Sequence, residues 1–194
     1  MRSYRASSLN ALWFLIAVNV LVFIVTLINQ EAVYTLFGLI PAIFLHRPWT
    51  IVTNLFVHGG FGHVMCNMIS LYFLGSFLIR LIGEKKFLTV YFLGGIVGNI
   101  LFILYYKLLP PPYPVIGVGA SGAIFALGGA LVMMAPRLPV FMFFIPIPVP
   151  LWIAIIVFLL ISFIPGIAWQ AHLGGLFLGL IAGYHFRKRR TYFY

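Results

Sequence analysis

Four polar side chains lie within apolar stretches of this chain, and two of them are the types that a serine hydrolase needs. Ser121 can act as a nucleophile if an imidazole takes its proton, and His172 is a candidate for that general base. His63 and Asn67 are four residues apart, so they face the same side if they lie on a helix. Ionisable groups are costly inside a membrane, and finding them there favours a functional site.

The composition identifies the surroundings of these residues as a lipid bilayer. Of the 194 residues, 63% are hydrophobic and 7% charged, which excludes a soluble globular domain. The only carboxylates are Glu31 and Glu84, and the chain has neither an aspartate nor an H-E-x-x-H motif. Aspartyl and zinc intramembrane proteases are therefore excluded, and we expect no metal or other cofactor.

Uncharged stretches separated by basic clusters and proline-glycine breaks predict an all-α membrane protein with one domain over residues 1–194. The proline-rich stretch 139–150 is expected to be extended chain at the membrane interface, and residues 48–60 are expected to form a loop. The six predicted spanning helices cover about residues 11–28, 62–82, 87–106, 121–134, 149–163 and 169–186.

The distribution of basic residues predicts the orientation. Six spans place both termini on one side, which then carries ten basic residues against two, Arg47 and Lys107, on the other. The positive-inside rule makes that side cytoplasmic, in a multi-pass protein of the cell membrane. The same rule explains the net charge of +10 without any nucleic-acid partner. The ten residues are Arg2, Arg5, Arg80, Lys85, Lys86, Arg137, Arg187, Lys188, Arg189 and Arg190.

Helical rise and small-residue patterns predict that the four polar residues meet. Counted from the cytoplasmic arginines, they lie at a common depth of about 20 to 25 Å. Residues 175, 179 and 183 are glycines, and residues 122, 126 and 130 are glycine or alanine, a spacing that lets membrane helices approach closely. Ser121 and His172 begin these two stripes. Ser121 also lies at a helix N-terminus, where free backbone N–H groups can stabilise an oxyanion.

Each residue also has a structural interpretation that the pattern leaves open. A serine in a membrane helix often bonds to the carbonyl one turn earlier, and His172 could form an interhelical hydrogen bond. His63 and Asn67 could serve packing alone. Asn19 and Asn99 share no cluster with the other polar residues, and we interpret them as packing residues.

Three motifs, in order, resemble the signature of the rhomboid intramembrane serine proteases. They are Gly119-Ala120-Ser121-Gly122, the run Ala171-His172-Leu173-Gly174-Gly175, and His58, His63 and Asn67 in the spacing H-x4-H-x3-N. The resemblance implies a six-helix rhomboid-like bundle that cleaves transmembrane segments of single-span membrane proteins. It also implies that Ser121 is the nucleophile, that His172 is the general base, and that His63 and Asn67 join the Ser121 backbone N–H in the oxyanion hole.

The chain departs from the family pattern at two places. Trp49 corresponds to the tryptophan of a Trp-Arg pair, but Thr50 replaces the arginine, and Ile79-Arg80-Leu81 replaces a Glu-x-Arg motif. Phe125 stands where many members have a tyrosine, and its ring is expected to pack against His172. Since no carboxylate is placed to orient His172, we expect a dyad and not a triad.

Two other functions compete with the protease. A catalytically inert rhomboid-like protein would bind transmembrane clients without cleaving them, and the presence of both Ser121 and His172 argues against it. A small transporter or channel is disfavoured because no charged residue other than the titratable histidines lines the membrane interior.

Overall fold

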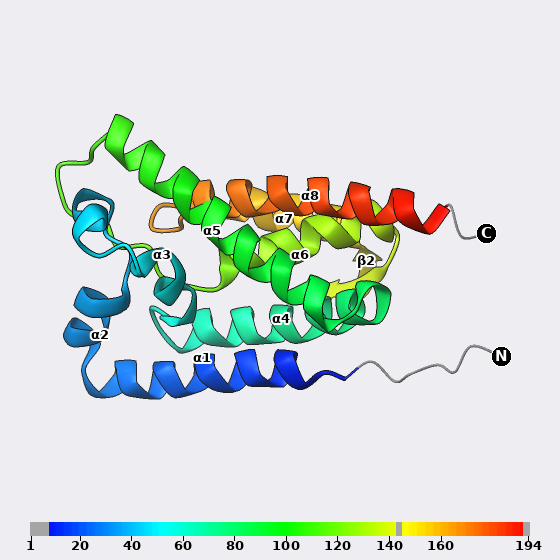
Figure 1. Cartoon of the computed structure of the whole chain (residues 1–194), viewed down its shortest axis with the longest axis horizontal. Helices are drawn as coiled ribbons and strands as arrows, with labels where there is room; N and C mark the ends of the chain where they lie inside the picture. Colours follow the sequence, from blue (N-terminus) through cyan, green and yellow to red (C-terminus); the bar gives the residue numbers. More distant parts are fainter. Residues whose placement is uncertain (1–7, 143–144, 192–194) are drawn as a thin grey trace.

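The computed structural model describes residues 8–142 and 145–191, which are mostly helical. Its longer helices lie side by side, and short helices cover one end of the bundle (Figure 1). The longer helices are α1 (Asn10–Ile28), α4 (Phe61–Ile82), α5 (Glu84–Leu108), α6 (Ser121–Met134), α7 (Leu151–Ile161) and α8 (Trp169–Thr191). The short ones are α2 (Gln30–Phe37), α3 (Thr50–Thr53) and the 3-10 helices η1 (Pro41–His46) and η2 (Asn54–Phe56).

All six helices expected from the sequence are present, with different ends. Helix α5 begins at Glu84 because Gly83, with φ of 83°, turns the chain directly from α4 into α5. Helix α8 continues to Thr191 through the basic tail, in which no proline or glycine stops it. Helix α7 is shorter than expected, because Pro150 holds the preceding residue in extended chain.

Among the helices of residues 8–142 and 145–191, three are long and apolar enough to cross a bilayer, namely α1, α4 and α5. Helices α6 and α7 are apolar but shorter, with 14 and 11 residues. These helices and the apolar composition define a multi-pass membrane protein.

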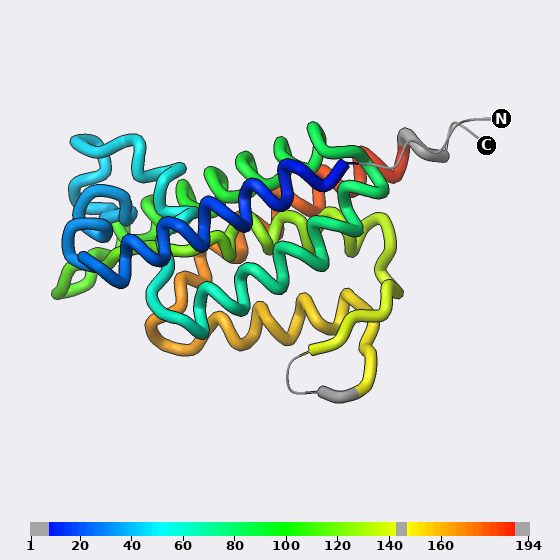
Figure 2. The backbone as a smooth tube through the Cα atoms, turned by 90° about the horizontal axis from the view of Figure 1, so that it is seen from below, coloured from blue at the N-terminus to red at the C-terminus, as the bar shows by residue number. Residues whose placement is uncertain are grey.

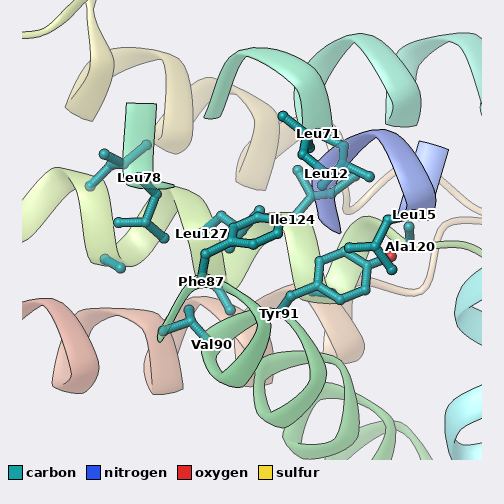
Figure 3. Close-up of a cluster of buried hydrophobic side chains, with 14 of the residues drawn as sticks. Leu12, Leu15, Leu71, Leu78, Phe87, Val90, Tyr91, Ala120, Ile124 and Leu127 are labelled. Atoms are coloured by element: carbon teal, nitrogen blue, oxygen red, sulfur yellow. The ribbon is translucent and has the colours of Figure 1, made fainter. Parts of the chain in front are cut away.

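Helix α6 lies at the centre of the bundle, and every one of its residues from 122 to 131 is buried. A helix that is apolar on all sides is typical of such a position. The core forms where α1, α4 and α5 meet α6 (Figure 3). The side chains labelled there are Leu12, Leu15, Leu71, Leu78, Phe87, Val90, Tyr91, Ala120, Ile124 and Leu127.

The first turn of α1 and the last turn of α8 lie at the same end of the molecule, together with the turn from α4 to α5 (Figure 1). Arg80 of α4 and Lys85 and Lys86 of α5 flank that turn, and α8 carries its basic tail to the same end. Arg2 and Arg5 lie outside the described residues. The described ends of α1 and α8 thus lie at one end of the bundle, together with these basic residues.

The sequence predicts a loop at 48–60, but residues 50–56 of that range form α3 and η2. With α2 and η1, most of the segment between α1 and α4 is helical.

The last carbonyls of α2, which have no partner within the helix, are capped by side chains further along the chain. Trp49 donates from Nε1 to the Leu36 carbonyl at 2.9 Å, and Thr53 donates from Oγ1 to the Phe37 carbonyl at 3.0 Å. Thr50 stands where the family has an arginine. Its hydroxyl donates to the Arg47 carbonyl at 2.6 Å, so it makes a local hydrogen bond three residues back along the chain.

The proline-rich stretch before α7 is extended, as expected, and forms a two-stranded antiparallel sheet. Strand β1 (Pro139–Met142) pairs with β2 (Ile145–Pro150), with Pro139 opposite Pro150. The sheet leads directly into α7, which lies at an edge of the bundle (Figure 2). It makes the protein mostly helical rather than all-α.

Candidate active site

Ser121 is the first residue of α6, where the backbone N–H groups of the first turn have no partner within the helix. The preceding Gly119 has a φ of 119°, which strongly favours glycine. Its N–H donates to the Asn54 carbonyl at 2.9 Å. The turn before α6 is thereby tied to the segment before α4, and this places the Ser121 hydroxyl beside free N–H donors.

The structure brings Ser121 and His172 into direct contact. The Ser121 Oγ atom lies 2.6 Å from His172 Nε2, although the residues are 51 positions apart. His172 is the fourth residue of α8 and lies in its first turn, and only 6% of its surface is exposed. The expected hydroxyl–imidazole pair is therefore present in a largely buried position.

Close packing of α6 against α8 makes this contact possible. A Cβ atom at Gly175 would collide with the Gly122 carbonyl of α6. The next two glycines of α8 meet α6 in the same way, Gly179 at Ala126 and Gly183 at Ala130. The two small-residue stripes expected from the sequence thus face each other position by position.

Two further side chains hold the His172 ring. Phe125, one turn after Ser121, stacks on it with ring centroids 4.5 Å apart and planes inclined by 21°, as expected. Ser162, directly after α7, has its Oγ atom 2.6 Å from His172 Nδ1. No motif or spacing in the sequence pointed to Ser162, although it is the only hydroxyl-bearing residue between 151 and 164.

His63 approaches the same site from α4. The Gly59 N–H donates to His63 Nδ1 at 3.3 Å, so the proton of the neutral ring is on Nε2. A Cβ atom at Gly119 would lie 2.7 Å from that Nε2 and 3.8 Å from Ser121 Oγ. Gly119 therefore leaves room for an N–H donor of His63 beside the Ser121 hydroxyl.

His58, in the loop before α4, supports the His63 ring. Its own ring lies edge-on to that of His63, with centroids 5.1 Å apart. Burial and, to a lesser extent, the charge of His63 lower the pKa of His58 to about 4. His58 is therefore neutral at physiological pH, and its Nδ1–H can donate to the Phe56 carbonyl at 3.3 Å.

Asn67 lies one turn after His63 and is buried. Its amide nitrogen donates to the His63 carbonyl at 2.8 Å, which uses one of its two N–H groups. Among the described residues, no hydrogen bond joins Asn67 to Ser121. The structure thus places Ser121 and His172 in direct contact and His63 against Gly119, two residues before Ser121. Asn67 keeps one further N–H to donate.

Sequence reasoning also missed the support provided by Asn54. Its side chain exchanges hydrogen bonds with that of Asn99 on α5, at 3.1 and 2.7 Å, while its carbonyl accepts from Gly119. Asn99 is thus a packing residue, as interpreted from the sequence. A single asparagine in a short helical turn carries no sequence signal for this role.

In the part of the chain that the structure describes, no hydrogen bond or ion pair joins Glu31 or Glu84 to His172. Glu84 accepts a hydrogen bond from the Ala11 N–H in the first turn of α1, and Glu31 lies in the first turn of α2. Among the described residues, no group of three or more His, Cys, Asp or Glu side chains could hold a metal ion.

The fold and the site together define a class of protein: a multi-pass membrane protein with a buried serine–histidine pair. The family model of the Rhomboid domain matches residues 45–189. This match covers most of the chain and includes His63, Ser121 and His172. The chain belongs to the rhomboid family.

Its relatives include named proteases and a protein named inactive. RHOMBOID-like protein 12, mitochondrial, of Arabidopsis thaliana is 30% identical over 76% of this chain and 49% of its own length. Rhomboid protease GluP of Bacillus subtilis is 36% identical over 45% of this chain and 16% of its own. Inactive RHOMBOID-like protein 8 of Arabidopsis thaliana is 30% identical over 44% of this chain and 23% of its own. The chain spans about half or less of the length of these relatives.

Proposed function

We propose that this chain is an intramembrane serine endopeptidase that cleaves transmembrane segments of single-span membrane proteins. Its helices α1, α4, α5, α6, α7 and α8 are the six spans of one domain, and both termini are cytoplasmic. The observation that carries the proposal is the 2.6 Å contact between Ser121 Oγ and His172 Nε2 at the N-terminus of a buried helix. Membership of a family that includes named proteases supports it.

The reaction follows from the two side chains. His172 Nε2 takes the proton of Ser121, and Ser121 Oγ attacks the scissile carbonyl carbon. His172 then gives that proton to the leaving amine as the C–N bond breaks, which leaves an acyl-enzyme. Water, deprotonated by His172, hydrolyses the ester and restores Ser121. No metal or other cofactor takes part in these steps.

The negative oxygen that forms during attack is stabilised by three donors in this proposal. The Ser121 backbone N–H lies at the positive end of α6, and His63 Nε2–H lies against Gly119, two residues before Ser121. The second N–H of the Asn67 amide is the third donor. Donors already in place cost no reorganisation when the charge develops.

The competing proposal is an inert rhomboid-like protein that binds transmembrane clients, as one relative's name allows. The geometry favours the protease, because an inert protein does not need a serine and a histidine at 2.6 Å with an N–H donor beside them. A panel of single-span substrates, incubated with the purified protein and followed by mass spectrometry of the product ends, separates the two. We expect new ends within or beside the transmembrane segment. Clients that co-purify but stay intact would favour the inert protein.

Removing an oxyanion donor should lower turnover and not binding. For Asn67→Ala and His63→Ala we expect kcat to fall by roughly 10² to 10³, with a much smaller change in KM. Ser76→Ala is the matched control, because Ser76 is buried on the same helix about 14 Å along from Asn67 and should leave kcat unchanged. Equal kcat values for Asn67→Ala and the control would show that Asn67 does not stabilise the oxyanion and serves packing alone.

A dyad predicts that neither carboxylate matters to the chemistry. Glu31→Gln and Glu84→Gln should leave kcat within a few fold, whereas neutralising a triad carboxylate costs about 10⁴. The Glu84→Gln side chain keeps a carbonyl oxygen for the Ala11 N–H. A collapse of kcat in either variant, with the same melting temperature as the parent protein, would contradict the dyad.

The stacked ring of Phe125 should contribute measurably to turnover. The face of an aromatic ring attracts the imidazolium formed during attack by about 0.5 to 2 kcal/mol. We therefore expect kcat of Phe125→Ala to fall between about twofold and thirtyfold. Phe125→Leu, which fills more of the space without a ring, separates the stacking from the packing. Full kcat in both variants would show that the ring has no catalytic role.

A further inference from the structure

Ser162 occupies an unusual place for a hydroxyl. It is the residue directly after α7, in a run of apolar residues, and only 2% of its surface is exposed. Its Oγ atom has two neighbours at hydrogen-bonding distance, the Phe158 carbonyl oxygen at 2.8 Å and His172 Nδ1 at 2.6 Å. Ser162 therefore contacts the ring nitrogen opposite the one that faces Ser121.

Counting protons decides which atom donates in each contact. A serine hydroxyl has one proton, and a carbonyl oxygen only accepts. If Ser162 donates to Phe158, both contacts are hydrogen bonds only when His172 Nδ1 carries a proton and donates to Ser162 Oγ. The opposite arrangement would leave two oxygen atoms 2.8 Å apart with no proton between them.

This assignment leaves His172 Nε2 as the unprotonated nitrogen of the neutral ring. An unprotonated Nε2 is the acceptor that a general base must present to the Ser121 hydroxyl at 2.6 Å. Once Nε2 has taken the proton, Nδ1–H still donates to Ser162. The contact is therefore kept through the proton transfer.

The stacked ring of Phe125 cannot supply this selection. A ring stacked at 4.5 Å limits the tilt of the imidazole plane, but it contacts both orientations of a flipped imidazole equally well. The Ser162 oxygen distinguishes Nδ1 from the carbon on the other side of the ring, because only a nitrogen can donate to it. The two contacts thus restrict different motions of His172.

We propose that Ser162 is a positioning residue that holds His172 in its Nδ1-protonated form and fixes the orientation of the ring. It occupies the place that a carboxylate has in a soluble serine protease. This inference rests on the proposed function, since it assigns a partner to the general base. It also answers how a chain without a nearby carboxylate orients that base.

Threonine and valine at this position form the test, because they have nearly the same shape and only threonine has the hydroxyl. Losing a hydrogen bond to a charged group predicts that Ser162→Val lowers kcat by about 10- to 100-fold, with KM within about twofold. Ser162→Thr should keep kcat within about threefold of the parent. Fluorophosphonate labelling of Ser121 should slow in Ser162→Val by a similar factor, because it depends on the same general base. Labelling needs no transmembrane substrate, so it reports on the site separately from substrate binding.

A second readout reports on the ring itself. In the parent protein, the ¹⁵N signals of labelled His172 should show a protonated Nδ1, and in Ser162→Val they should show both neutral forms. If valine prevents folding, Ser162→Ala serves in its place with the same expectations. Melting temperatures in detergent identify variants that are merely unstable.

The outcomes separate this inference from the proposed function. Equal kcat and equal ¹⁵N signals in Ser162→Val and Ser162→Thr would overturn the role of Ser162 while leaving the protease intact. A parent protein that is folded but neither cleaves nor is labelled would instead contradict the proposed function. Loss in valine with rescue by threonine would support both.

Discussion

Ser121→Ala and His172→Ala should each abolish cleavage while leaving the bundle folded. Each substitution removes one of the two atoms that are 2.6 Å apart and leaves the α6–α8 packing in place. In a soluble serine protease such losses lower kcat on the order of 10⁶-fold, which here means no detectable product. The measurement is product formation from a single-span substrate, with melting temperature as the control for folding.

The double variant gives a sharper test of the pair. Two groups that act as one unit are not additive, so Ser121→Ala with His172→Ala should be no worse than either single variant. The comparison requires an assay that detects residual hydrolysis above the uncatalysed rate. A double variant far less active than both singles would mean that the residues act independently.

Gly175→Ala should damage both the fold and the site, although it adds one methyl group. The added Cβ would meet the backbone carbonyl of Gly122, which cannot turn away as a side chain can. Overpacking of this kind costs roughly 1 to 3 kcal/mol and forces the two helices apart. Because a displacement of about 1 Å can cost 10²-fold in rate, labelling of Ser121 should slow by more than tenfold.

Gly62→Ala is the matched control for this substitution. Gly62 also lies in a helix, but apart from its chain neighbours and the nearby backbone of its own helix, no atom lies within 4 Å of a Cβ built there. Alanine should be neutral or slightly stabilising at that position. The melting temperature of Gly175→Ala should fall by roughly 2 to 12 °C relative to the control, since 1 kcal/mol lowers it by about 2 to 4 °C in a chain of this size. Equal stability and equal labelling of the two variants would show that α6 and α8 do not need glycine at their contact.

The meeting of Ser121 with His172 could be predicted from the sequence for a definite physical reason. Membrane helices associate through small residues, so two stripes at intervals of four specify which faces touch. Both polar residues begin their stripes, and the register between Gly175 and Gly122 then brings them together. The stacking of Phe125 was expected from the family resemblance and from its place one turn after Ser121, and the structure has it.

Other features depend on contacts that no local pattern carries. Helix α2 ends where it does because Trp49 and Thr53, far along the chain, bind its last carbonyls. Ser162 contacts His172 because the connection between α7 and α8 reverses the chain and places the end of α7 beside the start of α8. Loops of this kind have no periodicity to read, and polar residues in them gain their roles from tertiary structure.

Intact-protein mass spectrometry after treatment with a fluorophosphonate tests most directly whether Ser121 is an activated nucleophile. The folded parent protein should gain the mass of one adduct, mapped to Ser121 by peptide sequencing. Ser121→Ala should gain none, and His172→Ala should react far more slowly. A folded parent protein that stays unmodified, or an adduct that persists in Ser121→Ala, would contradict the assignment of Ser121 and His172 as a catalytic pair.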